Sequence, residues 1–166
     1  MYNYNVPYPN QFMLCSTYGM DFSMWAYNTA LNLIREALQS ERNDELKFNY
    51  LIENAPTQEE KDIITTIRDD ERLNRQWYRD IYKFYTNEEV ENNNGGEFTE
   101  PDSFLDGIKS SIFESLFAMQ RSRIIREGLP SRFIRDIVLR ILTDEMKHAT
   151  EYNYILSINS LNSNLG

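Results

Sequence analysis

The sequence is poor in the residues that mark disulfide scaffolds, strand-rich folds and membrane spans. It holds one cysteine, Cys15, so no disulfide can form within the chain, and no cluster around this thiol indicates a zinc site. Six glycines and five prolines are few for 166 residues, which favours long helices over short strands. No apolar run approaches the ~18 residues that a membrane-spanning helix needs. No Lys or Arg precedes Arg35, so we expect no secretory signal and a cytoplasmic protein.

Basic residues are also in the minority. The chain has 17 Lys and Arg against 26 Asp and Glu, which gives a formal charge of −9. So acidic a surface repels phosphate backbones, and we therefore expect no nucleic-acid partner. Apolar residues make up 41% of the chain, enough to fill the interior of one domain of this length.

Helical periodicity begins after an N-terminal segment that lacks it. Residues 1–24 are rich in Tyr, Asn and Pro, and we interpret them as an extended or disordered arm. Thr57 followed by Glu60 is a capping-box pattern that predicts a helix start. Apolar spacing predicts four helices, at about 25–54, 57–86, 103–128 and 131–157. A polar linker at 87–103 joins the second helix to the third, and residues 160–166 form a C-terminal tail.

The lengths of the connections predict how these helices are arranged. Short turns at Pro56 and Pro130 make two helix hairpins, because helices joined by a short turn pack antiparallel. The linker is long enough to run the length of the molecule. The expected fold is all-α, an antiparallel four-helix bundle over residues 25–159 that consists of two hairpins joined by a longer crossover linker.

A segment of the second predicted helix recurs in the fourth. Residues 61–74 align without a gap on residues 135–148, at a constant offset of 74. The aligned identical pairs are Asp62 with Asp136, Ile63 with Ile137, Ile67 with Ile141, Asp70 with Asp144, Glu71 with Glu145, and the turn residues Pro56 with Pro130. The two hairpins are thus similar halves.

The repeat places a carboxylate and an imidazole on an apolar helix face. Glu145 and His148 are three residues apart, nearly one helical turn, so both project from the same face. The rest of that face is apolar or aromatic: Ile134, Val138, Ile141, Tyr152 and Ile155. Burying such a pair without partners is costly, so we expect other groups to satisfy it.

The first hairpin contributes two more acids, Glu41 and Glu71, at the same position along the bundle as Glu145. Glu71 occupies the position that matches Glu145. Glu41 lies fifteen residues before Pro56 and Glu71 fifteen residues after it, so an antiparallel hairpin should bring the two acids together. The spacing therefore predicts a cluster of acids inside the bundle.

This pattern resembles the ferritin-like di-iron carboxylate proteins, and within them the rubrerythrin-like branch. Those proteins take one Glu from each of two helices and a Glu-x-x-His from each of the other two. The order of Glu41, the Ala55–Pro56 turn and Glu71 is similar to that of the branch, and residues 137–154 carry the most specific likeness. The resemblance implies a ferritin-like fold and metal ligands at Glu41, Glu71, Glu145 and His148.

Two of the six ligand positions that the resemblance implies carry other residues. Asn74 stands where a histidine is expected, and Ser115 where a glutamate is expected. Neutral amide and hydroxyl oxygens are poor substitutes around iron. Asp44 and Glu114 are candidate compensators, since Asp44 follows Glu41 by about one turn and a π-bulge could rotate Glu114 inward.

Two functions follow from the resemblance. Because both halves of the site have lost a ligand, we expect an empty or partly occupied site, no catalytic residue, and a structural or assembly protein. Some ferritin-like bundles of this size are described as spore-coat or sporulation-associated, which makes a spore-associated location a second expectation. The alternative is a di-iron or di-manganese redox protein that oxidises ferrous iron or reduces peroxide. Lacking a rubredoxin-like Cys-x-x-Cys, it would need an electron-donor partner. We expect a homo-oligomer, a dimer, and no membrane partner.

Overall fold

The computed structural model describes residues 22–90 and 98–163, and most of these residues are helical. Over these residues there are five helices and no strand, so the predicted all-α class is confirmed: α1 (Phe22–Gln39), α2 (Glu41–Asn54), α3 (Gln58–Thr86), α4 (Phe104–Gly128) and α5 (Arg132–Ser163). None of these helices combines the length and the apolar character that crossing a bilayer requires.

The two ends of the chain were predicted to be non-helical. Most of the predicted arm, with Cys15, lies outside the described residues, but residues 22–24 already belong to α1. In the predicted tail, residues 160–163 continue α5, and residues 164–166 lie outside the described residues.

Side-chain caps set the helix ends. Thr57 Oγ1 accepts a hydrogen bond from the backbone N–H of Glu60 at 3.3 Å, and the Glu60 carboxylate accepts one from the backbone N–H of Thr57 at 2.9 Å. The predicted capping box is therefore confirmed. Ser103 caps α4 in the same way, accepting from the N–H of Asp106 at 3.1 Å. Asn87 ends α3 in the left-handed conformation, with φ of 57°.

The helix predicted over about 25–54 is two helices rather than one, and the break falls at Ser40. The backbone N–H of Asn43 donates a hydrogen bond to the Ser40 carbonyl at 3.0 Å. This bond spans three residues, as in a 3₁₀ turn, instead of the four of an α-helix. The Ser40 hydroxyl donates to Asp44 at 2.8 Å and to the Ala37 carbonyl at 3.4 Å. These local bonds compete with the regular ladder, an effect that apolar periodicity does not register.

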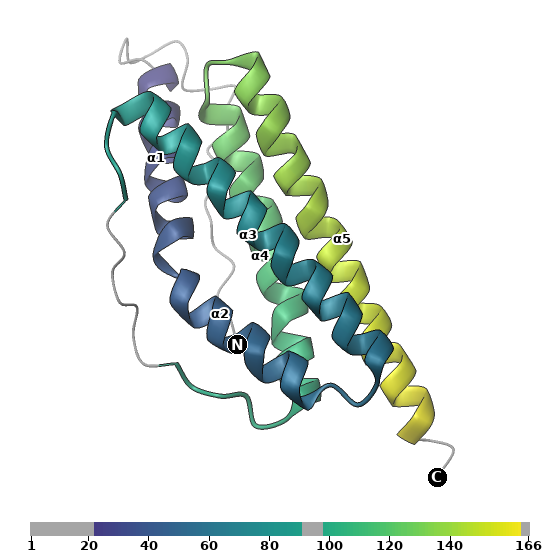
Figure 1. Ribbon diagram of the computed structural model, residues 1–166. Helices are drawn as coiled ribbons and strands as arrows, with labels where there is room; N and C mark the ends of the chain where they lie inside the picture. Colours follow the sequence, from purple (N-terminus) through teal and green to yellow (C-terminus); the bar gives the residue numbers. More distant parts are fainter. Residues whose placement is uncertain (1–21, 91–97, 164–166) are drawn as a thin grey trace.

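The five helices pack side by side, and neighbouring helices are either parallel or antiparallel (Figure 1). α1 and α2 follow one another and run antiparallel to α3, so that Tyr27 near the start of α1 contacts Tyr85 at the end of α3. α3 is antiparallel to α5, since Glu59 near the start of α3 accepts a hydrogen bond from Tyr154 late in α5. The end of α3 and the start of α4 lie at opposite ends of the molecule, so α3 and α4 run in the same direction.

One glycine allows α1 and α4 to meet closely. A Cβ at Gly128 would lie 2.2 Å from the backbone carbonyl oxygen of Ala26, far inside van der Waals contact. The end of α4 therefore packs directly on the backbone of α1, which a larger residue would prevent.

A polar layer divides the interior into two apolar clusters. One cluster lies toward the α1 end of the molecule and is made of Ala30, Ile34, Ala37, Leu38, Tyr78, Ile81, Tyr82, Ile125, Leu129, Ile134, Val138 and Ile141. The other lies toward the α2–α3 turn and is made of Phe48, Leu51, Ala55, Ile64, Ile67, Ile108, Tyr152 and Ile155. Along α5, Glu145 and His148 fall between the two clusters. The predicted polar interruption of an apolar helix face is thus a layer inside the molecule.

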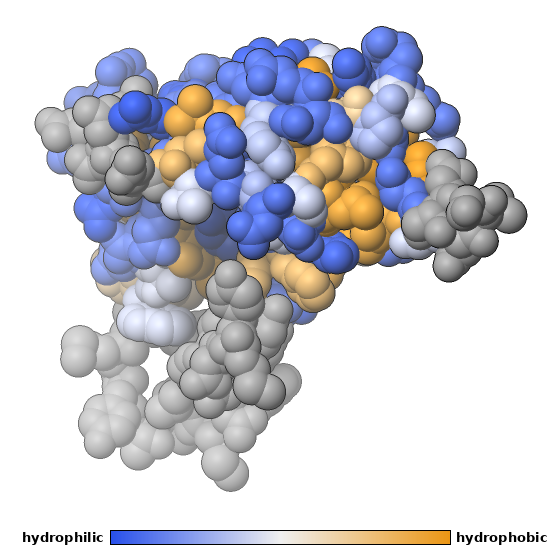
Figure 2. Space-filling view, turned by 90° about the horizontal axis from the view of Figure 1, so that it is seen from below, coloured by the Kyte–Doolittle hydropathy of each residue, from blue (hydrophilic) through white to orange (hydrophobic). Residues whose placement is uncertain are grey.

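The end of the molecule seen in Figure 2 has a largely hydrophilic surface, in line with the charge of the chain. Figure 2 shows the end of the molecule at which α2 leads into α3, where hydrophilic residues cover much of the face and apolar residues group between them. Several large apolar side chains are exposed, among them Phe84, Phe113 and Phe133.

Candidate functional site

Three of the four predicted metal ligands meet in the polar layer. Glu71 of α3 and Glu145 and His148 of α5 each offer one ligand atom, and these atoms all lie within 4.8 Å of one another. Glu145 is 5% exposed and His148 is fully buried. The 3.6-residue period places Glu145 and His148 on one face of α5, and the antiparallel packing of α3 brings Glu71 opposite them.

His148 is held between two carboxylates of α3. Its Nδ1 lies 3.1 Å from Glu71 Oε1, and its Nε2 lies 3.4 Å from Asp70 Oδ2. Lys147 donates to the same Asp70 oxygen at 2.6 Å. Burial lowers the pKa of His148, but the hydrogen bonds and charges of Glu71 and Asp70 together outweigh it and leave the pKa raised. The imidazole thus has partners without any metal ion.

Glu145 behaves as a buried acid beside a second acid. Burial, followed by the charge of Glu71 and a hydrogen bond with it, raises the pKa of Glu145 well above its usual range. A neutral Glu145 can donate a hydrogen bond to the Glu71 carboxylate, so one proton would do what a bridging cation does in a metal centre.

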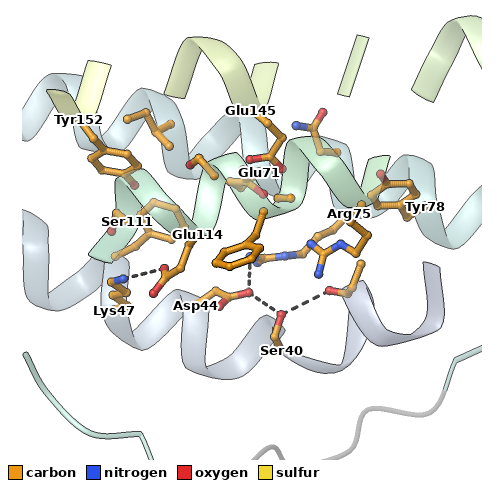
Figure 3. A pocket seen from close by; sticks show the side chains of 18 of the residues that line it. Ser40, Asp44, Lys47, Glu71, Arg75, Tyr78, Ser111, Glu114, Glu145 and Tyr152 are labelled. Carbon is orange, nitrogen blue, oxygen red and sulfur yellow. Dashed lines mark hydrogen bonds and ion pairs between the residues drawn. The ribbon is translucent and has the colours of Figure 1, made fainter. Parts of the chain in front are cut away.

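The fourth predicted ligand, Glu41, does not join the other three. It lies in the first turn of α2 and pairs with Arg79 of α3. Side chains on a helix tilt toward its N-terminus, so in an antiparallel pair two residues equally far from the turn point apart. Asp44 is instead the α2 acid that faces the interior beside Glu71 (Figure 3), and Glu71 adds to the raised pKa of Asp44, behind burial and against the attraction of Arg75.

The two substituted positions, Asn74 and Ser115, are both buried in the structure. Asn74 is 2% exposed, and Ser115 is also buried. Neither the amide nitrogen nor the amide oxygen of Asn74 has a hydrogen-bond partner in the described part of the chain. Glu114, the candidate compensator, points outward: its side chain is 61% exposed and accepts from Lys47 at 2.6 Å. α4 is a regular α-helix there, so no π-bulge turns Glu114 inward.

These groups border a cavity of about 260 Å³ inside the bundle. Its exposed wall residues are Ser40, at the break between α1 and α2, and Glu114 and Phe117 of α4, so the cavity opens between these segments, where Lys47 and Glu114 form an ion pair (Figure 3). The residues around it are Ala37, Ser40, Asp44, Lys47, Phe48, Leu51, Ile67, Glu71, Asn74, Arg75, Tyr78, Ser111, Glu114, Ser115, Phe117, Ala118, Arg121, Glu145 and Tyr152.

Two arginines in the cavity wall were missed by the sequence analysis. Arg75 is buried and donates to Asp44 at 2.9 Å, and Arg121 lies near enough to Glu145 for both guanidinium groups to lower its pKa, against the stronger effect of burial. The signal for Arg75 was its spacing, because it follows Glu71 by four residues and so shares its helix face. Basic residues interspersed among acids along a helix usually lie on a solvated face, so their pattern does not mark these two arginines as part of an interior site.

The residues present do not fit a pair of metal ions. Glu71, Glu145 and His148 could hold one divalent cation through two oxygens and a nitrogen. A second ion would need further charged ligands, but Glu41 is paired elsewhere and positions 74 and 115 are neutral. Arg75 and Arg121 bring positive charge to the same cavity, which disfavours a second cation there.

Comparisons with models of protein families, with curated proteins and with solved structures found no match to this chain. The likeness to the ferritin-like proteins therefore stays a prediction that rests on the repeat, the helix directions and the site residues alone.

Proposed function

We propose that this protein is a rubrerythrin-like, ferritin-like four-helix bundle with an incomplete di-metal site, and that it acts as a structural or assembly protein rather than as an oxidase. α1 and α2 together would represent the first helix of the bundle, interrupted at Ser40. The observation that carries the proposal is the presence of Arg75 and Arg121 in the cavity that also holds Glu71 and Glu145.

The helix directions support the fold assignment. One long segment, α1 followed by α2, runs down the molecule in Figure 1, α3 and α4 both run up, and α5 runs down again. A crossover between the second and third helices is the connection that distinguishes ferritin-like bundles from bundles with short loops throughout. The aligned turns at Pro56 and Pro130 and the matched Glu71 and Glu145 support a common origin for the two halves.

The charge pattern supports the loss of redox function. In the polar layer Glu71 is paired with His148 and Asp44 with Arg75, and Arg75 and Arg121 bring positive charge beside Glu145. A metal centre of this class needs negative ligands that are not already neutralised by protein cations. The competing redox hypothesis retains one supporting observation, the approach of three ligand atoms to within 4.8 Å.

Exposed aromatic side chains support an assembly role. At the end of α3 and the start of α5, Phe84 is 71% exposed and Phe133 is 75% exposed. Phe84, with Trp77, Ile81 and Ile137, borders a shallow apolar groove between the two helices, and Phe133 immediately precedes Ile134, which also borders it. Apolar side chains gathered at one place on a surface mark interaction sites more often than singly scattered ones do. A second copy of the chain is the partner we expect there.

An oxygen-consumption assay tests the redox part of the proposal. Protein would be mixed with ferrous iron without oxygen, exposed to air, and compared with a His148→Ala variant and with buffer alone. We expect the wild type and H148A to oxidise iron at the same rate, because neither forms a two-ion centre. Oxidation that is faster in the wild type and is lost in H148A would refute the proposal.

Sedimentation measurements test the assembly part. We expect the wild type to be a dimer that dissociates in the Phe84→Ser/Phe133→Ser double variant. Phe113→Ser is the matched control, since Phe113 is also exposed but lies on α4, away from the groove. A wild type that stays monomeric at all concentrations, or a dimer that the double variant leaves intact, would contradict this site of assembly.

A further inference from the structure

The cavity has unpaired hydrogen-bonding groups that the incomplete metal site does not explain. Both amide atoms of Asn74, the Nη1 of Arg75 and the Nε of Arg121 are buried and have no hydrogen-bond partner among the residues that the structure describes, although Arg75 Nη1 lies 3.9 Å from Glu45 Oε1. All three residues border the cavity. Buried polar groups without partners are few in native proteins, so three such residues around one cavity point to an occupant that pairs with them.

The unpaired atoms indicate the chemistry of that occupant. Three of the four are N–H donors, on Asn74, Arg75 and Arg121, and only the Asn74 oxygen is an acceptor. An occupant rich in acceptor oxygens would satisfy them best. Two guanidinium groups disfavour a cation and favour a carboxylate, which arginine binds through charge-assisted hydrogen bonds. Asp44 already pairs with one amino group of Arg75 and Glu71 pairs with His148, so the positive charge left for an occupant is mainly that of Arg121.

The remaining walls would accommodate a carbon skeleton. Phe48, Leu51 and Ile67 form an apolar surface on one side, and Phe117 and Ala118 of α4 add to it near the opening. Ligand sites typically combine apolar walls with a few convergent polar groups in this way. The volume of about 260 Å³ suits a small molecule rather than a long chain.

We propose that this cavity binds a small organic monocarboxylate, with its carboxylate on Asn74, Arg75 and Arg121 and its carbon skeleton against the apolar wall. Ordered water is the competing occupant, since it also pairs with unsatisfied buried groups. Water and a carboxylate differ in a measurable way, because only the carboxylate needs the guanidinium charge. This inference does not depend on the proposed function, since it uses the unpaired donors, and the one implied ligand position among them, Asn74, is used for its amide and not as a metal ligand.

Isothermal titration of the full chain tests this proposal with benzoate and hexanoate as probes. Benzyl alcohol and hexanol are the neutral counterparts of the same shape. We expect saturable binding of at least one carboxylate and none of its alcohol. In Arg121→Met, which keeps the length of the side chain, binding should weaken about tenfold or more, because a charge-assisted hydrogen bond is lost. Arg132→Met is the matched control on an exposed arginine and should bind like the wild type.

Three results would overturn the proposal: no saturable binding of either carboxylate, equal binding of the alcohols, or full binding in R121M. Circular dichroism would show that each variant is folded. Asn74→Leu provides a second test that does not remove a charge. It should lose carboxylate binding while remaining folded, and binding that survives in N74L would count equally against the site.

Discussion

Replacing Asn74 with leucine should stabilise the protein. Asn74 is 2% exposed, and neither polar atom of its amide has a partner in the described structure. Leaving such a group buried and unpaired costs about 1–3 kcal/mol, and an apolar side chain of similar size removes that cost. We therefore expect Asn74→Leu to raise the free energy of unfolding by about 2 kcal/mol. For a chain of this length the melting temperature should rise by roughly 4–8 °C.

The assay is urea unfolding followed by circular dichroism, with thermal unfolding as a second measurement. Part of any gain could come from the better helix propensity of leucine. Asn153→Leu controls for this, because Asn153 is an exposed residue of α5. We expect N153L to change stability by no more than about 0.5 kcal/mol.

A loss of stability in N74L would refute the reasoning. It would mean that the amide of Asn74 is satisfied by something that is bound in the cavity of the purified protein. A gain in stability together with lost carboxylate binding would show that Asn74 is kept for binding at the expense of stability, as residues of binding sites often are.

Three further predictions concern pH, close packing and capping. The pKa values of Glu145 and His148 are both raised in the fold, so the folded state holds these protons more tightly than the unfolded state. Stability should therefore fall as pH rises above about 4.5 for Glu145 and above about 6.5 for His148, and Glu145→Gln should flatten the first part of this dependence in urea unfolding. Gly128→Ala should cost about 3 kcal/mol by thermal unfolding, because its Cβ would meet the backbone of α1, whereas Gly107→Ala should cost about 1 kcal/mol because it meets a side chain that can move. Thr57→Ala removes the cap of α3 and should cost about 1 kcal/mol, whereas an unchanged melting temperature would show that the capping box contributes nothing.

The trio of Glu71, Glu145 and His148 could be predicted from the sequence because two periodic signals agree. The 74-residue repeat matches Glu71 with Glu145, and the helical period puts His148 beside Glu145. Helix ends were predictable where a side chain caps them, as at Thr57. Such signals depend on neighbouring residues and on regular geometry, which a sequence shows directly.

The position of Glu41 and the two arginines could not be predicted in the same way. Counting from Pro56 gives the level of Glu41 along the helix but not the direction of its side chain, which Arg79 draws away. Arg75 and Arg121 belong to a residue type that is mostly exposed, and the burial of Arg75 and the half-buried position of Arg121 bring them near charged groups of other helices. Contacts of this kind between side chains of different helices can be predicted only when the three-dimensional arrangement of the helices is known.

The central claim, an incomplete di-metal site, is tested most directly by elemental analysis. The protein would be expressed with added iron and manganese and purified without a histidine tag or a chelator, alongside a Glu145→Ala variant. We predict well under one ion per chain, with no difference between the wild type and E145A. About two iron or manganese ions per chain in the wild type, lost in E145A, would contradict the account.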